Sequence, residues 1–450
     1  MSKEKRHLDL NEVQKAEDTR NSIRNRLARL TRRPDKISLQ AMELEDGSVT
    51  TAADEMAEQL KAHWSRVFGE EDPDLDAVRD WFAWARQQHV PTSSCPAGAW
   101  RVRRRDVVRA LRLAGNSRPG PDGIPFEAWR RLEQLGVNIL FAVAQQLERG
   151  LDSTRSTHLK FNESLMACLP KTASRQDASG RGIYKPDETR PLTITNCDNR
   201  IVASAFRWRW EPLLAPTITR QQRGFIRGRS MIRNIVEIEH EAMIAAIEEQ
   251  DAALILFDFR AAFPSLGREY LFHSLEAFGF PPSAMCVVRS LYLNTTAHLM
   301  LMGQTHGAIM MAKGIRQGCP LSPLLFAIAT HSFLHLVNVR HNRSTVRAFA
   351  DDTAMIIRSW RRDGRKVFRT FHGFGRVSQM RLNLVKTVGI PLWPEDPELV
   401  RDRLAASPAD PHITWADAGK YLGVFIGPGK GHRSWAKPLA KFRERLGDWP

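Results

Sequence analysis

The stretch that decides the fold reads VRAFADDTAMII and runs from Val346 to Ile357. Two apolar segments flank a pair of adjacent aspartates, Asp351 and Asp352. Apolar runs on either side of a short polar break predict two β-strands joined as a hairpin, with the carboxylates at its tip. The two like charges repel each other there, and a bound cation relieves that repulsion. The other interpretation is an ordinary surface turn, because aspartate is common in turns.

A further acidic residue lies in a different apolar run, AALILFDF, which covers Ala252 to Phe259. A nearly continuous apolar run is typical of a strand that is buried on both faces, and Asp258 lies near its end. A buried carboxylate needs a partner, because an unpaired one is costly. Alternatively, Asp258 caps a helix that begins in the residues that follow, AAFPSL. The run by itself leaves both interpretations open.

Together these stretches place three carboxylates on two separate strands. Hard divalent ions such as Mg²⁺ prefer oxygen ligands and are typically held by one or two carboxylates together with substrate phosphates. A two-metal phosphoryl-transfer site requires such a set, because one ion activates the attacking hydroxyl and the other stabilises the leaving group. The pattern therefore favours nucleotidyl transfer over a purely structural use of the acids.

The composition points to a polyanionic partner. The chain has 450 residues, of which 42% are hydrophobic and 26% charged, and these fractions are ordinary for a globular protein. At this length two or three structural units are expected. The formal net charge of +16 is not ordinary, and a field of that sign attracts nucleic acid. The alternative is a ribosome-associated or simply basic protein.

Cysteine usage and hydropathy bear on the compartment. The five cysteines are scattered without a CxxC pair, so we expect neither a disulfide framework nor a zinc knuckle. No apolar run approaches the roughly 20 residues that a membrane span needs. The first residues, MSKEKRHLDLNEVQ, lack the apolar core of a secretory signal. We therefore expect an intracellular protein that does not enter a membrane.

Apolar residues at helical spacing predict helices in several places. Helices are expected towards the end of residues 1–36, where Ile23, Leu27 and Leu30 have helical spacing, and over residues 51–68, 126–149 and 432–450. The first is basic and amphipathic, which suits a phosphate-contacting arm or a solvated face. In the second, four large residues fall on one side: Met56, Leu60, Trp64 and Phe68. The polar residues 172–189 predict a mobile loop between strands.

At AFADD, residues 348–352, the chain resembles the active-site hairpin of reverse transcriptases, which carry an aromatic–x–Asp–Asp signature. Further segments resemble this family and follow in its order. They are SRPGPDGIP at 117–125, MACLPK at 166–171, RPLTITNCDNRI at 190–201, QQRGFIRGRS at 221–230, DFRAAFPSL at 258–266, GIRQGCPLSPLLFAI at 314–328, RLNLVKTVGI at 381–390 and YLGVFIG at 421–427. The QQRGFIRGRS segment is similar to an insertion of non-LTR, LINE-like retrotransposon enzymes.

The resemblance implies an α+β fold of the right-hand polymerase type, with an RRM-like palm built on an antiparallel sheet. Residues 1–96 would form a basic helical N-terminal extension and residues 97–235 the fingers. Residues 236–390 would form the palm with the catalytic site. Residues 391–450 would hold the end of the palm, the primer grip and the start of a partial thumb.

The resemblance also implies roles for single residues. Asp258, Asp351 and Asp352 would be the catalytic residues and would bind two Mg²⁺ ions, with Mn²⁺ as a substitute. Phe263 falls five positions after Asp258, where the family places the steric gate that excludes a ribose 2′-hydroxyl. Simple core packing is the alternative for this ring.

Cations and close-packed residues complete the implied nucleotide site. Lys171 and Arg190 match the fingers residues that contact the triphosphate, where fixed cations stabilise developing phosphoryl charge. Gln317 and Gly318 match the segment that lines the nucleotide and template pocket. Lys386 matches a basic residue proposed to assist pyrophosphate departure. Leu422 and Gly423 match the primer grip.

Some positions depart from the family pattern. Asn199 and Arg200 stand where relatives often carry an aromatic or small residue followed by lysine, so the basic charge is kept. Pro264 stands where an aspartate is frequent, which leaves the metal ligands untouched. No endonuclease-like segment precedes the match and no Cys/His knuckle follows it. We therefore expect either a trimmed polymerase or one part of a polyprotein whose endonuclease domain or other parts lie elsewhere.

The implied function is extension of a DNA primer with dNTPs on an RNA template, in the life cycle of a retroelement. A nuclear or cytoplasmic ribonucleoprotein location follows from it. The alternatives are a group II intron-type or domesticated reverse transcriptase, and a catalytically inactive RNA-binding scaffold of the same fold. A viral RNA-dependent RNA polymerase is disfavoured by FADD in place of Gly-Asp-Asp and by the aromatic gate.

Overall fold

The computed structural model describes residues 39–69, 73–151, 160–171, 173, 175–178, 180–393, 396, 398–399 and 412–447. The basic helix expected within residues 1–36 lies outside the described residues. The described part mixes helices and sheets, so the α+β class is confirmed.

A five-stranded sheet carries the stretches from which the sequence argument began. Its order is β10 (Thr345–Phe349), β11 (Asp352–Ile357), β7 (Ala253–Phe257), β12 (Val388–Pro391) and β13 (Thr414–Trp415). Neighbouring strands are antiparallel except β12 and β13, which pair in parallel. The hairpin predicted from VRAFADDTAMII is therefore present as β10 and β11.

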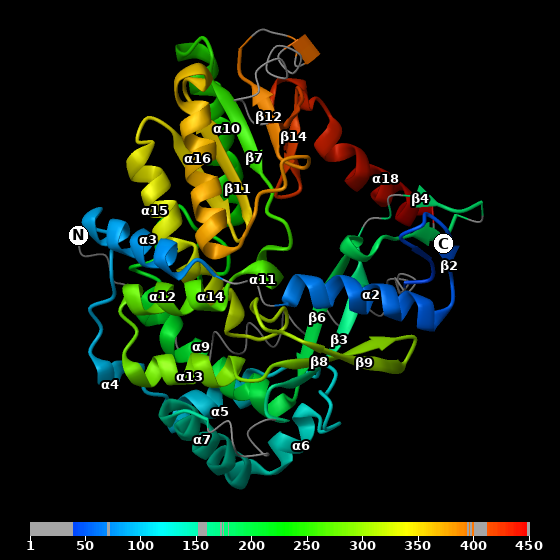
Figure 1. Cartoon of the computed structure of the whole chain (residues 1–450), viewed down its shortest axis with the longest axis vertical. Helices are drawn as coiled ribbons and strands as arrows, with labels where there is room; N and C mark the ends of the chain where they lie inside the picture. Colours follow the sequence, from blue (N-terminus) through cyan, green and yellow to red (C-terminus); the bar gives the residue numbers. More distant parts are fainter. Residues whose placement is uncertain are drawn as a thin grey trace. The chain divides into compact units, whose positions relative to one another are not determined.

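The central strand β7 is buried on both faces, which explains its continuous apolar run. Alternate residues Ala253, Ile255 and Phe257 pack in the large core with helix α16 (Trp360–Ser378). Leu254 and Leu256 face the opposite way and pack with helix α10 (Met231–Glu248). The two helices flank β7 and β11 (Figure 1). Burial of side chains of this size contributes roughly 1.5–3 kcal/mol each, so this strand is a stable base for whatever follows it.

A four-stranded sheet has the order β6 (Thr189–Thr195), β3 (Glu163–Pro170), β8 (Thr296–Leu301) and β9 (Gln304–Met310). β3 and β8 pair in parallel, whereas β8 and β9 form an antiparallel hairpin. Burial alternates along β3, β6 and β8, as expected for strands with one packed face.

Helices make up most of the remaining described structure. They are α2 (Ala53–Phe68), α3 (Leu75–Gln87), α4 (Ala97–Trp100), α5 (Arg104–Leu113), α6 (Phe126–Arg131), α7 (Glu133–Arg149), α9 (Cys197–Leu214), α11 (Ala262–Ser265), α12 (Arg268–Phe278), α13 (Pro282–Tyr292), α14 (Ser322–Ala329), α15 (His331–Arg340) and α18 (Arg433–Gly447), with 3-10 turns η1 (Pro186–Glu188) and η2 (Pro428–Lys430). The large residues predicted on one side of α2 are all buried. The helical region expected over 126–149 is confirmed, with one break at Glu133, whose φ of +43° divides it into α6 and α7.

The chain separates into two compact units. One contains the described residues up to Met56 together with Cys168–Arg190, and the other contains the rest. In the first unit lie the paired strands β1 (Met42–Glu43) and β2 (Val49–Thr50). The domain boundaries expected from the sequence stay predictions.

The described residues of the predicted loop at 172–189 contain short elements of secondary structure. β4 (Arg175–Gln176) pairs with β5 (Gly182–Ile183), and η1 follows. The Glu43 carboxylate forms ion pairs with Arg175 at 3.7 Å and with Lys185 at 3.4 Å. These long-range contacts hold a segment whose own composition only indicated a loop.

Two further expectations concern cysteine and membranes. All five cysteines are free, as the sequence predicted. One stretch of the described residues, Ser322–Arg340, is long and apolar enough to span a membrane, but 78% of its apolar part is buried inside the protein. Such burial is typical of a core helix, and α14 and α15 do pack in the large core.

Candidate active site

The three predicted aspartates lie at the same edge of the five-stranded sheet. Asp258 directly follows β7, and Asp352 begins β11. β11 and β7 pair antiparallel with Thr353 opposite Phe257, so the next pair in this register is Asp352 opposite Asp258. Asp351 lies in the β10–β11 turn. The helix-cap interpretation of Asp258 is wrong, because α11 begins after Ala261 and has no side-chain cap.

The β10–β11 turn is tight. Phe349 pairs with Asp352, which leaves Ala350 and Asp351 as a two-residue loop. Ala350 has a φ of +60°, whereas Asp351 does not have a positive φ. Two-residue hairpins with this pattern favour glycine at the first position, so alanine here is held against its own preference.

The backbone of Asp258 is anchored by the segment that precedes β12. The Asn383 N–H donates to the Asp258 carbonyl at 2.8 Å. The Asp258 N–H donates to the Thr387 hydroxyl at 3.3 Å. Lys386, in the same segment, is exposed. RLNLVKTVGI thus fixes the main chain at Asp258, a role that the resemblance did not indicate.

The chemistry of these side chains suits a hard cation. Carboxylate oxygens are the ligands that Mg²⁺ prefers, and none of the three acids is fully buried. Within the described ranges, however, no three His, Cys, Asp or Glu side chains are grouped closely enough to hold a metal ion. The chemistry of the donors fits a metal ion, and the role of each carboxylate as a ligand stays a prediction.

Phe263 lies in α11 and is partly exposed. Its ring stacks on Phe326, with centroids 4.5 Å apart and planes at 7°. The ring of Phe225 meets it edge-on at 5.9 Å, and Phe225 has a φ of +65°. A ring that is clamped on one face and open elsewhere suits a gate as well as a packing residue.

Gln317 and Gly318 make close backbone contacts with β6. The Thr193 N–H and hydroxyl both donate to the Gln317 carbonyl, at 2.7 Å and 3.0 Å. Gly318 has a φ of +129°, and a Cβ there would lie 2.1 Å from the Thr193 carbonyl oxygen. Glycine is thus required at Gly318 by the chain itself.

Lys171 and Arg190 belong to the unit that holds β1 and β2, and both are exposed. The Lys171 ammonium donates to the Asp187 carbonyl at 2.9 Å, and the Lys171 N–H donates to the Glu188 carbonyl. Their predicted contact with a triphosphate stays a prediction.

Leu422 and Gly423 form the turn of the hairpin of β14 (Gly419–Tyr421) and β15 (Val424–Ile426). The Asn234 amide of α10 donates both to the Ala348 carbonyl at 3.0 Å and to the Tyr421 hydroxyl at 3.2 Å. This hydroxyl donates in turn to the Arg347 carbonyl at 3.3 Å. Burial raises the pKa of Tyr421, which stays a neutral donor. The hairpin predicted to be the primer grip is therefore tied to β10, the strand that leads into the Ala350–Asp351 turn.

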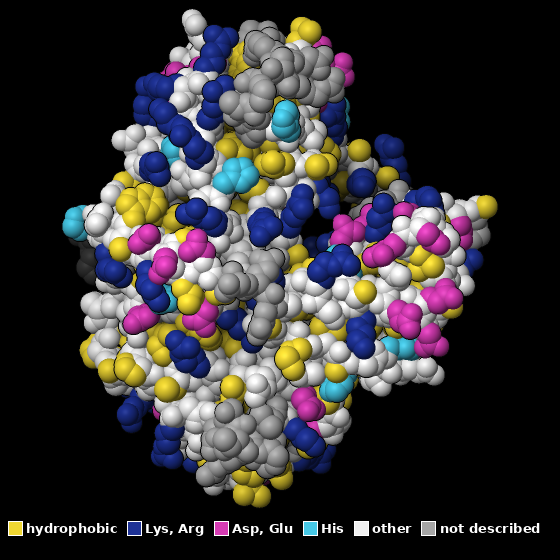
Figure 2. Space-filling view, viewed as in Figure 1, with side chains coloured by type: hydrophobic (Ala, Val, Ile, Leu, Met, Phe, Trp, Pro, Cys, Tyr) yellow, Lys and Arg dark blue, Asp and Glu magenta, His cyan; other side chains and the backbone are white. Residues whose placement is uncertain are grey.

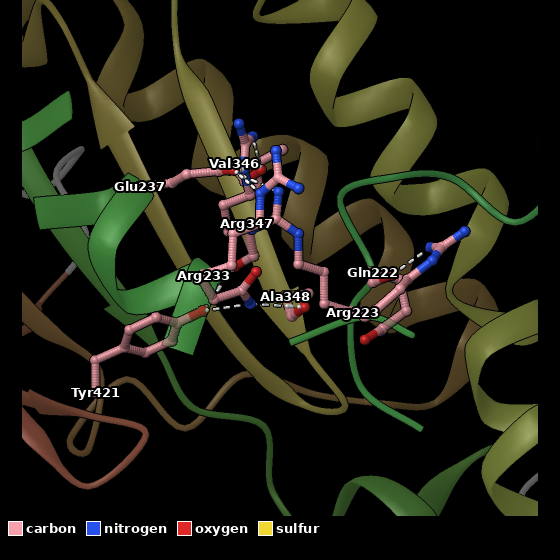
Figure 3. A network of polar contacts seen from close by, with 10 residues as sticks. Gln222, Arg223, Arg233, Glu237, Val346, Arg347, Ala348 and Tyr421 are labelled. Carbon is pink, nitrogen blue, oxygen red and sulfur yellow. Dashed lines mark hydrogen bonds and ion pairs between the residues drawn. The ribbon is translucent and has the colours of Figure 1, made fainter. Parts of the chain in front are cut away.

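An ion cluster that the sequence did not reveal lies beside β10. The Glu237 carboxylate accepts hydrogen bonds from Arg223 and Arg347, each at 2.7 Å, and from Arg233 at 2.9 Å (Figure 3). Burial raises the pKa of Glu237, but the three arginines outweigh it and lower the pKa to about 2. Arg223 lies within the QQRGF segment, Arg233 and Glu237 lie in α10 and Arg347 lies in β10, so the cluster joins these three parts of the chain.

One fully buried and one partly buried arginine were also missed. Arg316 is fully buried beside the Tyr292 ring, and Arg268 lies 5.2 Å from the same ring. Burial lowers the pKa of Arg268 to about 10. An acidic partner would have been the usual signal for buried arginines, and local sequence offers none.

Cations also line a cavity near the end of β7. Its volume is about 540 Å³, and its wall includes Arg260, Arg376, Arg381 and His372. Arg260 lies two residues after Asp258, and its N–H donates to the Arg381 carbonyl at 2.9 Å. Lysine and arginine side chains are spread over the face drawn in Figure 2. This charge attracts phosphate-bearing ligands.

These features define a mixed α+β domain with acids at one sheet edge and a basic surface. The family described as "Reverse transcriptase (RNA-dependent DNA polymerase)" matches residues 177–426, more than half of the chain. The chain belongs to this family, and the prediction of an RNA-directed DNA polymerase domain is confirmed.

Relatives agree with the expected lineage. The chain is 25% identical over 333 residues to "Transposon TX1 uncharacterized 149 kDa protein" of Xenopus laevis, covering 71% of this chain and 24% of that protein. It is 24% identical over 370 residues to "Retrovirus-related Pol polyprotein from type-2 retrotransposable element R2DM" of Drosophila melanogaster, covering 77% of this chain and 32% of that protein. The matches thus span about a quarter to a third of these relatives. The predicted resemblance to a non-LTR retrotransposon reverse transcriptase is confirmed.

Proposed function

We propose that this chain extends the 3′-hydroxyl of a DNA primer with dNTPs on an RNA template, as part of a LINE-like retroelement. The observation that carries the proposal is the β7–β11 register, which sets Asp352 opposite Asp258 in a chain of the reverse transcriptase family. Asp351 adds a third carboxylate next to this pair. The proposal includes the right-hand arrangement of fingers, palm and partial thumb, and work in a nuclear or cytoplasmic ribonucleoprotein.

Asp258, Asp351 and Asp352 would hold two Mg²⁺ ions, or Mn²⁺ in their place. When bound, such ions supply activation of the attacking hydroxyl and stabilisation of the leaving pyrophosphate. The donor set supports this assignment, since all three side chains offer oxygen ligands.

The other residues act on the nucleotide and the primer. Phe263 would exclude the 2′-hydroxyl of a ribonucleotide, which its partly exposed and clamped ring supports. Lys171 and Arg190 would contact the triphosphate as fixed cations. Gln317 and Gly318 would line the nucleotide and template pocket.

Two roles concern the later segments of the chain. Lys386 would assist the departure of pyrophosphate, and the exposure of its side chain to solvent supports this role. Leu422 and Gly423 would support the primer end, which the hydrogen bonds from Tyr421 and Asn234 to β10 support. An endonuclease domain or other parts of a polyprotein would act together with this chain.

Primer extension tests the proposal directly. Purified protein is given a DNA primer annealed to an RNA template, Mg²⁺ and either dNTPs or rNTPs. We expect dNTP incorporation, and Asp351→Asn should reduce it by more than about 100-fold, since loss of even outer-shell support costs 10–100-fold. Asp76→Asn is the matched control, because Asp76 is exposed and pairs only locally with Arg79 at 2.8 Å.

RNA binding, measured by fluorescence anisotropy, should stay within about twofold in both variants, because one carboxylate contributes little to a phosphate-dominated interface. RNA binding without any incorporation by the wild-type protein would instead support the inactive-scaffold alternative.

Phe263→Ala tests the gate. The ratio of rNTP to dNTP incorporation should rise by roughly 10-fold or more. The reason is that the variant lacks the ring that excludes the 2′-hydroxyl, a discrimination worth about 1–3 kcal/mol. The ratio is unaffected by a general loss of activity. An unchanged ratio would leave Phe263 as a packing residue of Phe326.

A further inference from the structure

The QQRGF segment contains a buried side chain that holds the catalytic turn. We propose that Gln222 is a positioning residue, which sets the backbone at Ala350 and thereby the metal affinity of the carboxylates that follow it. The inference rests on the proposed function, because it assumes that Asp351 and Asp352 bind metal.

The Gln222 amide brackets Ala350 from both sides. Its oxygen accepts the Ala350 N–H at 2.9 Å, and its nitrogen donates to the Ala350 carbonyl at 3.0 Å. One side chain therefore fixes the two peptide planes on either side of Ala350. The second of these planes is the one that joins Ala350 to Asp351, so Gln222 acts on the backbone that carries the acid.

The amide has no hydrogen-bonding capacity to spare. Its oxygen also accepts the Gly224 N–H at 2.9 Å, and its nitrogen also donates to the Thr330 hydroxyl at 3.2 Å. Two donors and two acceptor positions are thus all used, in a side chain that is fully buried. No other natural side chain of this shape supplies both roles at once.

The turn needs such support. Ala350 has a left-handed φ of +60°, which costs roughly 1–2 kcal/mol for a residue with a Cβ. Such a conformation persists only where the surrounding structure holds it, and it is often found at functional sites. Gln222 is the described side chain that contacts both polar groups of Ala350.

Gln222 is itself held firmly. The main chain on either side of it pairs with β10: the Ala348 N–H donates to the Gln221 carbonyl, and the Arg223 N–H donates to the Ala348 carbonyl, both at 2.8 Å. Gln222, Arg223 and Ala348 lie close together in Figure 3. Gly224 permits this approach, since a Cβ there would lie 2.1 Å from the Ala350 nitrogen.

A half-buried arginine holds the loop behind Gln222. The Arg229 guanidinium donates to the carbonyls of Gln222 at 2.5 Å and Thr219 at 2.6 Å. It also donates to those of Ala215 and Ile218, each at 2.7 Å. The positioning contact thus begins at a rigid base, as accurate placement of a site requires.

Two substitutions separate the parts of this contact. Gln222→Met keeps the length of the side chain and removes all four hydrogen bonds. Gln222→Glu keeps the shape and the two accepted hydrogen bonds but cannot donate to the Ala350 carbonyl. The matched control is Gln221→Met, because the Gln221 amide contacts Thr219 and not the turn.

The test measures metal binding apart from turnover. Mn²⁺ affinity is measured by isothermal titration calorimetry, and the Mg²⁺ dependence, kcat and dNTP KM by primer extension. We expect Gln222→Met and Gln222→Glu to weaken Mn²⁺ binding and lower kcat by about 10–100-fold. The dNTP KM should change by less than about threefold at saturating Mg²⁺, because the nucleotide contacts are intact. Gln221→Met should behave as wild type.

The other outcomes contradict either the inference or the proposed function, and they can be told apart. Wild-type Mn²⁺ affinity in folded Gln222→Met, as judged by its thermal melt, overturns it even if turnover falls, because Gln222 would then be merely structural. If Gln222→Met fails to fold, a wild-type Mn²⁺ affinity in the more conservative variant Gln222→Glu overturns the inference equally. A wild-type protein that binds Mn²⁺ but incorporates no dNTP refutes the proposed function alone, and the calorimetric comparison still decides the role of Gln222.

Discussion

Among the hairpin turns of this protein that need a left-handed backbone, those of β14–β15 and β10–β11 obtain it differently. In the β14–β15 turn the positive φ values fall on Leu422 and Gly423, and glycine adopts such a φ without strain. In the β10–β11 turn the positive φ falls on Ala350, and Gln222 holds it from a segment 128 positions away. The first turn is encoded in part by its own glycine, Gly423. The second depends on tertiary contacts, and it is the one that carries the acids.

The largest effect is expected at Gly224, where the QQRGF segment comes closest to the backbone of Ala350 in the β10–β11 turn. In Gly224→Ala the new Cβ would overlap the Ala350 backbone, and backbone cannot move aside cheaply. We expect a loss of about 1–3 kcal/mol in the free energy of unfolding, measured by urea denaturation. Primer extension should fall by about 10–100-fold as the turn shifts.

Gly373→Ala is the control for this substitution. Gly373 lies within α16, and a Cβ there meets nothing within 4 Å. The change should be neutral or stabilise the helix by about 0.5–1 kcal/mol. Equal losses in the two variants would mean that the approach of Gly224 to the turn is unimportant.

A smaller effect is expected from the ion cluster that supports β10. Glu237→Gln leaves three arginines without their shared acid and should cost about 1–2 kcal/mol at pH 7, with partial exposure limiting the effect. The control is Glu276→Gln, whose side chain is 75% exposed. Urea unfolding of both variants measures the difference.

The pH dependence of this difference has a definite sign. The pKa of Glu237 lies at about 2 in the folded protein, below its ordinary value of 4.5. The folded state therefore gains from the ionised carboxylate above pH 4.5, and the gain is lost as the pH falls from 4.5 towards 2. Wild type and Glu237→Gln should thus converge in stability towards pH 2. A constant difference down to that pH would contradict the cluster.

The smallest effect is expected at the β14–β15 turn. Gly423→Ala meets no neighbouring atom within 4 Å, but its φ of +92° strains any residue with a Cβ. The cost should be about 1 kcal/mol in unfolding free energy, with dNTP incorporation on a pre-annealed primer reduced less than in Gly224→Ala. A loss of activity as large as that of Gly224→Ala would show that both turns are equally critical.

Much of the fold could be predicted from local pattern. The hairpin at Val346–Ile357, the doubly buried strand before Asp258 and the apolar face of α2 follow from spacing alone, because neighbouring residues in a chain reveal which face is buried. The sequence did not reveal the helix break at Glu133 or the pairing of β4 with β5. The first depends on one backbone dihedral, and the second on ion pairs with Glu43.

By itself, the sequence determined the family, the order of its segments and the identity of the three acids, since those are properties of residue type and spacing. Only the tertiary structure decided that Asp352 lies opposite Asp258, that Glu237 joins three arginines and that Gln222 brackets Ala350. The physical reason is that strand register and buried hydrogen bonds join residues about a hundred positions apart. No local periodicity records such a pairing, because it exists only once the chain has folded.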